Sequence, residues 1–170
     1  QLLYTSGTTG QPKGCIMSHQ YELMCGAWYA DLGGMATLRA GQERVYNPLP
    51  LYHVNAGVVS LLGMMLIGGC QIQPDRFHPR SWWRDVVETK ASVIHYLGVV
   101  APMLLNQPED PLERSHGVRF GLGAGVEPGL HSVFEDRFGV PLIELWGMTE
   151  MCRVIAANNE PRKRGTRAMG

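Results

Sequence analysis

The residues with the clearest chemical potential lie near the start of the chain, in the stretch Thr5-Ser6-Gly7-Thr8-Thr9-Gly10-Gln11-Pro12-Lys13-Gly14. Glycines in such a loop allow backbone conformations that turn successive N–H groups inward around an anion. The serine and threonine hydroxyl groups add further donors, and Lys13 supplies a full positive charge. A dense set of donors with one cation suits a triphosphate, so this stretch predicts a phosphate-binding loop.

Two other interpretations of this loop are less favoured. Its spacing differs from the GxxxxGK[ST] loop of P-loop NTPases, because Lys13 is followed by Gly14 rather than by a serine or threonine. The structural alternative is a flexible Gly/Thr linker. A linker has no need of Pro12 and Lys13 fixed between glycines, which favours phosphate binding.

Three further clusters follow segments that have the pattern of strands: Pro50-Leu51-Tyr52-His53, Gly123-Ala124-Gly125-Val126-Glu127-Pro128 and Leu145-Trp146-Gly147-Met148-Thr149-Glu150. Ligands of parallel sheets bind at the carboxyl ends of strands, and glycines there let a flat ring come close to the backbone. Each cluster also has an ordinary structural interpretation: a packed or capped His53, a tight strand–helix turn at residues 123–128, and Glu150 as a surface carboxylate. Only their occurrence together favours function.

The four motifs together resemble a known family. Residues 4–14, YTSGTTGQPKG, are similar to the signature of the adenylate-forming superfamily, which includes acyl-CoA synthetases, luciferases and the adenylation domains of peptide synthetases. The PLYH and aromatic-Gly-x-Thr-Glu motifs follow in the family's order, although the usual aromatic is Tyr where this chain has Trp146. Residues 50–53 look closer to acyl-CoA ligases than to peptide-synthetase domains, and residues 81–103 most resemble crotonobetaine/carnitine-CoA ligase-like members.

The resemblance implies a nucleotide site drawn from the glycine-containing motifs. Its members would be Thr5, Ser6, Gly7, Thr8, Thr9, Gly10, Lys13, Gly123, Ala124, Gly125, Val126, Trp146, Gly147 and Thr149. The residues from Ser6 to Lys13 would hold the β- and γ-phosphates of ATP. Trp146 would stack on the adenine and Thr149 would donate to the α-phosphate.

The resemblance also implies a catalytic set and a metal site. Catalysis would involve Lys13, His53, Thr149 and Glu150, with His53 lining the pocket for the substrate carboxylate. Glu150 and Thr5 would bind Mg²⁺, which prefers hard oxygen ligands. The other histidines, including His95, are expected to be structural.

The reaction implied is a two-step activation of a carboxylic acid. The carboxylate attacks the α-phosphate of ATP to give an acyl-adenylate and pyrophosphate, and coenzyme A then displaces AMP. Two alternatives stay open: a non-catalytic nucleotide-binding fragment, and an amino-acid-activating adenylation domain. The second is disfavoured because no Asp follows His53 closely enough to pair with a substrate amine.

An alternation of strand and helix patterns surrounds the motifs. Strands are expected at residues 1–4, 44–48, 71–73, 92–96, 118–122 and 142–145. Helices are expected from Ser18 to about residue 32, over 56–67, from Pro79, over 101–106 and from Pro128 to about residue 138. This order predicts an α/β fold with a mostly parallel sheet flanked by helices. By resemblance, it is part of the large N-terminal domain of an acyl-adenylate synthetase.

The helical spacing also predicts which side chains share a buried face. The expected faces are Tyr21, Met24, Cys25, Trp28 and Leu32 in the first helix, Trp82, Trp83, Val86 and Val87 in the third, and Leu130, Val133, Phe134 and Phe138 in the last. The segment 56–67 is the longest apolar stretch and contains glycines, which predicts a buried helix too short to cross a bilayer.

The chain is expected to be a single incomplete domain of 170 residues. Residues 1–40 would form the phosphate loop and its helix, residues 41–157 an α/β subdomain, and residues 158–170 a loop toward the missing remainder. The basic residues 162–164 are expected to be solvated. Without the remainder we expect negligible turnover, and the apolar surface left uncovered predicts self-association into a homo-oligomer.

Composition excludes some other classes. Lys plus Arg and Asp plus Glu are both 15, so the formal net charge is zero and no one-sided positive field is available for nucleic acid. The four cysteines have no paired spacing, which argues against a zinc site or a disulfide framework and favours the cytoplasm. The expected partners are therefore small molecules: a carboxylic acid, ATP, Mg²⁺ and coenzyme A.

Overall fold

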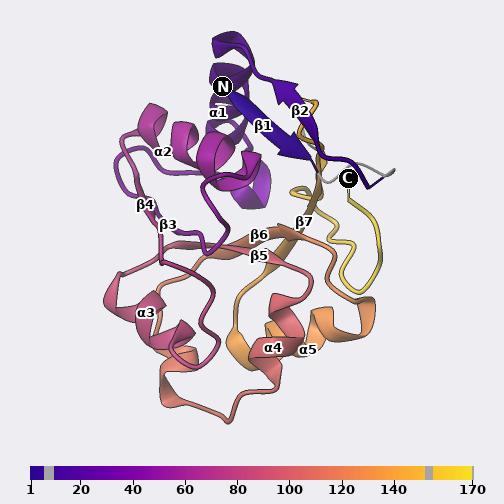
Figure 1. Cartoon of the computed structure of the whole chain (residues 1–170). Helices are drawn as coiled ribbons and strands as arrows, with labels where there is room; N and C mark the ends of the chain where they lie inside the picture. The colour runs from indigo at the N-terminus through magenta and orange to yellow at the C-terminus, as the bar shows by residue number, and fades with distance from the viewer. Residues whose placement is uncertain (6–9, 152–154, 170) are drawn as a thin grey trace.

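The computed structural model describes residues 1–5, 10–151 and 155–169 of the chain. A central sheet separates two layers of helices (Figure 1). Its strand order is β4 (Cys70–Ile72), β3 (Arg44–Tyr46), β5 (Val93–Leu97), β6 (Phe120–Ala124), β7 (Leu142–Trp146) and β8 (Ile155–Ala156). All neighbouring strands are parallel except β7 and β8, which are antiparallel. The expectation of an α/β fold with a mostly parallel sheet is confirmed.

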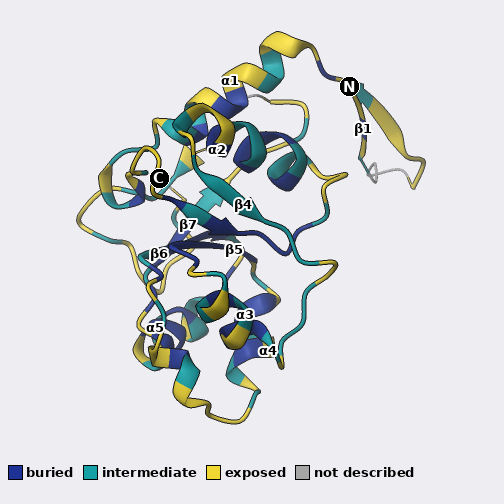
Figure 2. Cartoon of the chain, turned by 90° about the vertical axis from the view of Figure 1, so that its left-hand side faces the viewer, coloured by how far each residue is buried: buried dark blue, intermediate teal, exposed yellow. Residues whose placement is uncertain are grey.

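One face of the sheet is covered by α3 (Trp82–Glu88), α4 (Val100–Leu105) and α5 (Pro128–Phe138), with the 3-10 turn η3 (Pro111–Arg114) beside them (Figure 1). Aromatic residues dominate this part of the core: the rings of Phe134 and Phe138 meet at a centroid distance of 4.6 Å, and Trp82 has no exposed surface. Burial of these large side chains holds the layer formed by α3, α4 and α5 against β5 and β6. Both strands are mostly dark blue, or buried, in Figure 2.

The other face is covered by α1 (His19–Ala30), by η1 (Gly34–Ala36) and by a helix that begins as the π-helical η2 (Asn55–Ser60) and continues as α2 (Leu61–Ile67). The helices α1 and α2 approach closely at glycines. A Cβ on Gly26 would lie 2.7 Å from the Leu62 Cβ, and one on Gly63 would lie 2.4 Å from the ring of Tyr29. Neither position can therefore carry a side chain without moving the helices apart.

A β-hairpin precedes α1. The strand β1 (Leu2–Thr5) pairs with β2 (Lys13–Ile16) in antiparallel register, so Thr5 lies opposite Lys13. The sequence pattern predicts β1 but not β2, because the residues of β2 belong to the motif interpreted as a loop. Ser18 caps α1 by accepting a hydrogen bond from the Tyr21 N–H at 3.0 Å, as expected for this residue type.

Several local expectations are wrong in detail. The helix α3 begins at Trp82, because Pro79 lies in the turn before it. The buried side of α1 is centred on Cys25, Gly26 and Tyr29, whereas Met24 is 39% exposed. Met65 and Leu66 of α2 are also exposed, so this apolar helix is buried on one side only. On α5 the exposed member of the expected face is Val133. Apolar character alone did not identify the side that meets the sheet.

The segment after β8 returns across α5, and a buried carboxylate holds it there. Glu135 accepts hydrogen bonds from His131 Nε2 at 3.1 Å, from the Leu142 N–H at 2.8 Å, and from both Arg162 and Arg164. The expectation that residues 162–164 are solvated is therefore wrong for Arg162, which is half-buried, whereas Lys163 and Arg164 are exposed. We call Glu135, His131, Arg162 and Arg164 the Glu135 cluster.

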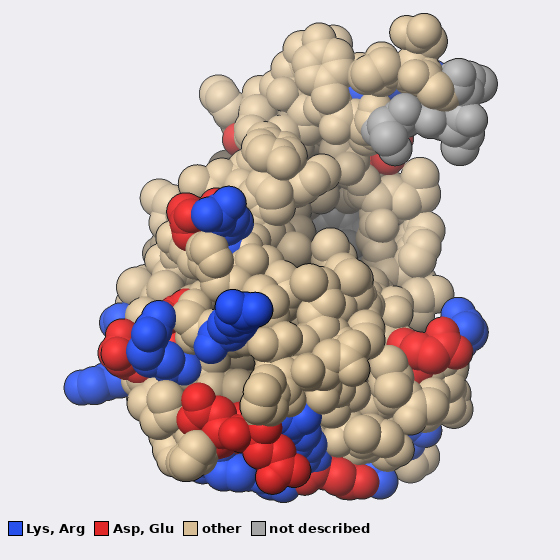
Figure 3. Space-filling view, turned by 60° about the horizontal axis from the view of Figure 1, so that its bottom comes forward, with Lys and Arg blue, Asp and Glu red and all other residues tan. Residues whose placement is uncertain are grey.

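Charged side chains elsewhere are mixed in sign. On the face shown in Figure 3, acidic and basic residues lie next to one another and neither forms a one-sided patch. Among the described residues, none of the helices combines the length and apolarity that a bilayer crossing requires.

The Glu135 cluster predicts a pH-dependent contribution to stability. Burial alone would raise the pKa of Glu135, but hydrogen bonds from His131 and Arg162 outweigh it and lower the pKa to about 2. A lowered pKa stabilises the folded state above the ordinary carboxyl pKa of 4.5, and this contribution is lost as the pH falls from about 4.5 to about 2.

We therefore expect Glu135→Ala to lower the free energy of unfolding by about 3 kcal/mol at pH 7, because it leaves buried partners unpaired. Urea titrations at pH 7 and pH 3 measure the effect, which should shrink at the lower pH. Glu88→Ala, at an exposed position on α3, is the control. Equal losses at the two positions would contradict the assignment.

Candidate functional site

A cavity of about 420 Å³ opens at the carboxyl ends of β5, β6 and β7, on the side covered by α1 and η2. Its wall is mainly apolar or aromatic and is built by Cys25, Trp28, Tyr29, Val54, Asn55, Val59, His95, Leu97, Ala124, Gly125, Leu145, Trp146, Gly147, Met148, Met151 and Met169. Parallel strands bring their carboxyl ends to one edge, so loops distant in sequence converge there. The cavity therefore lies where the sequence pattern expects a ligand.

The predicted nucleotide residues after β6 and β7 meet at this cavity. Ala124, Gly125, Trp146 and Gly147 line it, and Trp146 is 36% exposed. Gly123 and Val126 are buried behind the wall instead. A Cβ on Gly123 would lie 2.2 Å from the Tyr96 carbonyl oxygen, so its lack of a side chain is required by packing within the sheet.

Gly125 is held in place by a buried acid on the next strand. It has a φ of +83°, and a Cβ on the neighbouring Gly98 would lie 1.8 Å from its carbonyl oxygen. The Gly125 N–H donates to Glu144 Oε2 at 2.8 Å, while Tyr96 OH donates to Glu144 Oε1 at 2.8 Å. Burial and the adjacent carboxylate raise the pKa of Tyr96 above its ordinary value. Glu144 thus fixes the turn that walls the cavity.

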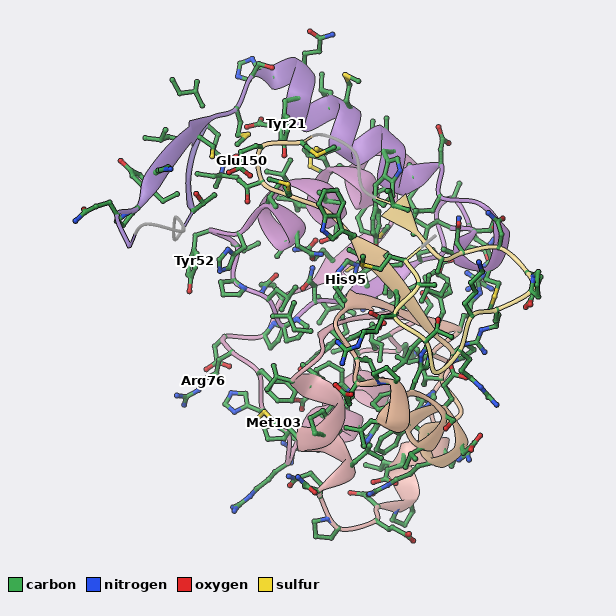
Figure 4. The ribbon with its side chains drawn as sticks, turned by 90° about the vertical axis from the view of Figure 1, so that its right-hand side faces the viewer. Tyr21, Tyr52, Arg76, His95, Met103 and Glu150 are labelled. Atoms are coloured by element: carbon green, nitrogen blue, oxygen red, sulfur yellow. The ribbon has the colours of Figure 1, made fainter. Side chains whose placement is uncertain are left out.

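The Thr149–Glu150 pair is tied to α1. The Tyr21 hydroxyl lies 2.7 Å from the Thr149 carbonyl oxygen and 3.0 Å from that of Met151, and it donates to this pair of acceptors. Figure 4 shows Tyr21 and Glu150 side by side beneath the start of α1. The contact therefore ties the loop after β7 to α1, the helix that follows the β1–β2 hairpin in sequence.

The structure describes the two ends of the predicted phosphate loop, Thr5 and residues 10–14. Ser6, Gly7, Thr8 and Thr9, all predicted to bind nucleotide, lie outside the described residues. Thr5 and Lys13 are paired across the hairpin, and Gly10 has a φ of +81°, which favours glycine. Lys13 is exposed and Thr5 is half-buried. The roles assigned to all of these residues stay predictions.

His53 lies in a turn at the surface, and its predicted role stays a prediction. It is exposed and does not line the cavity, whereas the next two residues, Val54 and Asn55, do. The cause is a tight turn: the His53 N–H donates to Pro50 O at 3.0 Å, and a Cβ on Gly57 would lie 2.0 Å from Leu51 O. In this structure the turn directs residues 51–53 outward, as Tyr52 shows in Figure 4.

His95 borders the cavity, although the sequence pattern offers only a structural role for it. The side chain has no exposed surface, and burial lowers its pKa to about 3, so the ring is neutral. Its Nε2 lies 2.7 Å from Tyr29 OH, and its Nδ1 lies 2.8 Å from Asn55 Oδ1. A polar link between α1, β5 and η2 therefore lies at the base of an otherwise apolar cavity.

Comparison with known proteins now identifies the family. The chain matches the family described as AMP-binding enzyme over residues 1–170. It belongs to the AMP-binding enzyme family. The resemblance read from the motifs is thereby confirmed at the level of the family, and the relatives include acid–CoA ligases.

The relatives cover most of this chain. Long-chain fatty acid transport protein 3 of Homo sapiens is 34% identical over 149 residues, which are 87% of this chain and 21% of that protein. The medium/long-chain-fatty-acid–CoA ligase FadD6 of Mycobacterium tuberculosis is 34% identical over 169 residues, or 98% of this chain and 28% of the ligase. The chain thus spans between about a fifth and a third of the relatives' length.

Solved structures show the same fold. A benzoate CoA ligase from Burkholderia xenovorans LB400 superimposes with a TM-score of 0.82 at 19% identity, covering 99% of this chain and 34% of that one. The o-succinylbenzoate coenzyme A synthetase MenE from Bacillus subtilis, in complex with AMP, gives 0.77 at 24% identity, with coverage of 99% and 42%. The chain therefore shares the α/β fold found in the N-terminal domains of acyl-CoA synthetases.

Three residues of the site carry no motif signal. Glu144, Tyr21 and Asn55 act through contacts between elements that are distant in sequence. Glu144 offers the one usable clue, because an acidic residue within the apolar strand Leu142–Trp146 must find a buried partner. Tyr21 and Asn55 offer none, since polar residues are ordinary at a helix start and after a strand.

The contact between α1 and the loop after β7 predicts a functional effect. Tyr21→Phe removes the donor that fixes Thr149 and Met151, so we expect adenylate formation by the full-length protein to fall about tenfold. Tyr52→Phe removes an exposed hydroxyl and is the control for folding, measured by thermal denaturation. An unchanged rate in a folded Tyr21→Phe protein would contradict the positioning role.

Proposed function

We propose that the protein containing this chain is an ATP-dependent acid–CoA ligase. It activates a carboxylic acid as an acyl-adenylate and transfers the acyl group to coenzyme A. The observation that carries the proposal is the convergence of Gly125, Trp146 and Gly147 on one apolar cavity, with Thr149 and Glu150 held at its edge by Tyr21. Family membership and the names of the ligase relatives support it.

The cavity supports an acid with an apolar body. Its wall is built mostly from Val, Leu, Met and aromatic side chains, which favour burial of hydrocarbon. None of the described lining residues is an Asp or Glu. An amino acid substrate would leave its ammonium group without a carboxylate partner, so an acid without an amine is the better candidate. The fatty-acid names of several relatives agree with this inference.

The nucleotide side of the proposal rests on the residues around the cavity mouth. Trp146 is exposed enough to stack on adenine, and Gly125 lets the ring approach the backbone. Thr149 is half-buried beside it and could donate to the α-phosphate. Lys13, exposed at the end of the hairpin, supplies positive charge for the outer phosphates.

Glu150 is suited to binding Mg²⁺. The carboxylate is exposed, and the structure records no protein partner for it among the described residues. Those residues also contain no group of three or more His, Cys, Asp and Glu side chains that could hold a metal by themselves. Mg²⁺ is commonly bound through one or two carboxylates together with substrate phosphates. When bound, the ion would neutralise charge on the phosphate oxygens; Thr5 is the second candidate ligand.

The chain's contribution to the first step is positioning. The substrate carboxylate oxygen forms a bond to the α-phosphorus while the bond from that phosphorus to the bridging oxygen breaks, and pyrophosphate leaves with the electron pair. The apolar cavity keeps the acid beside the nucleotide and excludes water. In the second step the coenzyme A thiolate attacks the acyl carbon and AMP leaves. Coenzyme A, cytoplasmic location and a role in fatty acid metabolism belong to this proposal.

ATP–pyrophosphate exchange by the full-length protein tests the function. We expect exchange that depends on both Mg²⁺ and an added carboxylic acid, together with thioester formation when coenzyme A is present. Exchange that responds to amino acids alone would overturn the acid–CoA assignment, and absence of exchange across acids of varied length would overturn the activity.

Glu150→Gln tests the metal site. It removes the charge of the exposed carboxylate while preserving its size, so we expect adenylate formation to fall about a hundredfold at a fixed Mg²⁺ concentration. Glu88→Gln, on α3 and across the sheet from the cavity, is the matched control. Undiminished Mg²⁺-dependent exchange by a folded Glu150→Gln protein would exclude the metal role.

A further inference from the structure

The orientation of the polar groups at the base of the cavity is fixed by one backbone donor. The Leu49 N–H donates to Asn47 Oδ1 at 3.0 Å, so the other side-chain atom of Asn47 is the amide nitrogen. That nitrogen donates to Asn55 at 3.0 Å and to Ser60 Oγ at 2.9 Å. The Asn55 atom in this contact must accept, and is therefore Oδ1.

The same logic sets the tautomer of His95. Because Asn55 Oδ1 is an acceptor, His95 Nδ1 at 2.8 Å must carry the proton. The ring is neutral, since burial lowers the pKa of His95 to about 3, so Nε2 accepts from Tyr29 OH at 2.7 Å. Every polar atom of the Tyr29 and His95 side chains is thereby used. Neither residue has a free donor to offer a ligand.

Asn55, in contrast, has a hydrogen-bond donor that is free to bind a ligand. Its Oδ1 accepts from both Asn47 and His95, whereas its Nδ2 has no hydrogen-bond partner among the described residues. Nor is Nδ2 among the fully buried unpaired atoms of those residues, which are Glu22 Oε1, Tyr46 OH and Trp82 Nε1. Asn55 lines the cavity and is half-buried. Its amide N–H groups are therefore a donor held rigidly at a wall whose neighbours are apolar.

This donor lies on the deep side of the cavity. His95, to which Asn55 is bonded, precedes the end of β5 at Leu97 by two residues, or about 7 Å along a strand. The predicted nucleotide residues Trp146 and Gly147 lie at and beyond the end of β7. An acid whose carboxylate faces the nucleotide would thus present a more distant part of its chain to Asn55.

We propose that Asn55 selects acids whose apolar chain carries an oxygen acceptor, such as a keto or ether oxygen. This inference rests on the proposed ligase function and names a substrate class for that site. A plain hydrocarbon chain would leave the Asn55 donor unpaired or would have to retain a water there, so it binds less well than an oxygen-bearing chain of equal length.

The experiment compares chain-matched pairs of acids, one plain and one with a single keto or ether oxygen placed along the chain, by ATP–pyrophosphate exchange in the full-length protein. We expect wild-type kcat/KM to favour an oxygen-bearing acid at one position of the oxygen by about tenfold. In Asn55→Leu, which keeps the branched shape and the number of side-chain heavy atoms but has no donor, that preference should disappear or reverse. Ser60→Ala changes the same network away from the cavity and should keep the preference.

Thermal denaturation separates loss of folding from loss of selectivity, and the wild-type preference requires no variant. Exchange with plain acids and no preference at any oxygen position would overturn the role of Asn55 and leave the ligase function standing. A preference that survives Asn55→Leu would assign it to another residue and would also overturn the proposal. If no acid supports exchange, both the function and this inference fail.

Discussion

The architecture of the site depends on the hydrogen bond between Tyr29 and His95. Tyr29 of α1 is completely buried and packs where Gly63 of α2 leaves room for its ring, and its hydroxyl reaches His95 on β5 at 2.7 Å. A buried hydroxyl without a partner is costly, so this bond fixes the distance between the helical layer and the sheet. The apolar space beside it stays open because the layer can approach no further.

The parallel topology then decides which residues share that space. The strands β5, β6 and β7 run in one direction, so the ends that carry Leu97, Ala124 and Trp146 form one edge. Two contacts refine this edge: Glu144 holds the turn at Gly125, and Tyr21 holds the loop at Thr149. Both join elements that no motif connects. The residues at the cavity are therefore positioned by side chains that lie outside the motifs.

The polar groups of the cavity lie at its base and near its mouth. The described wall has hydrocarbon and aromatic surface on most sides, a neutral imidazole and a carboxamide at its base, and the exposed Glu150 near its mouth. This separation suits a reaction in which a charged centre forms at one end while an apolar chain is buried at the other. It also explains why His95 is neutral, since a charged ring there would lack solvation.

The sequence by itself determined the family, the alternation of strands and helices, and the motifs that converge at the strand ends. These follow from local signals: glycine and proline positions, the Ser18 cap, and the period of apolar residues. It did not reveal β2, the outward turn at His53 or the exposed sides of α1, α2 and α5. The tertiary structure alone assigned roles to Tyr21, Asn55, His95 and Glu144. Most of their hydrogen-bond partners are distant in sequence. Tyr21 bonds to Thr149, 128 positions away, and His95 bonds to Tyr29, 66 positions away. Asn55 bonds to residues 8 and 40 positions away, and Glu144 to residues 48 and 19 positions away. The physical reason is that a hydrogen-bond partner is fixed by distance in space, and periodicity records only which side of an element is apolar.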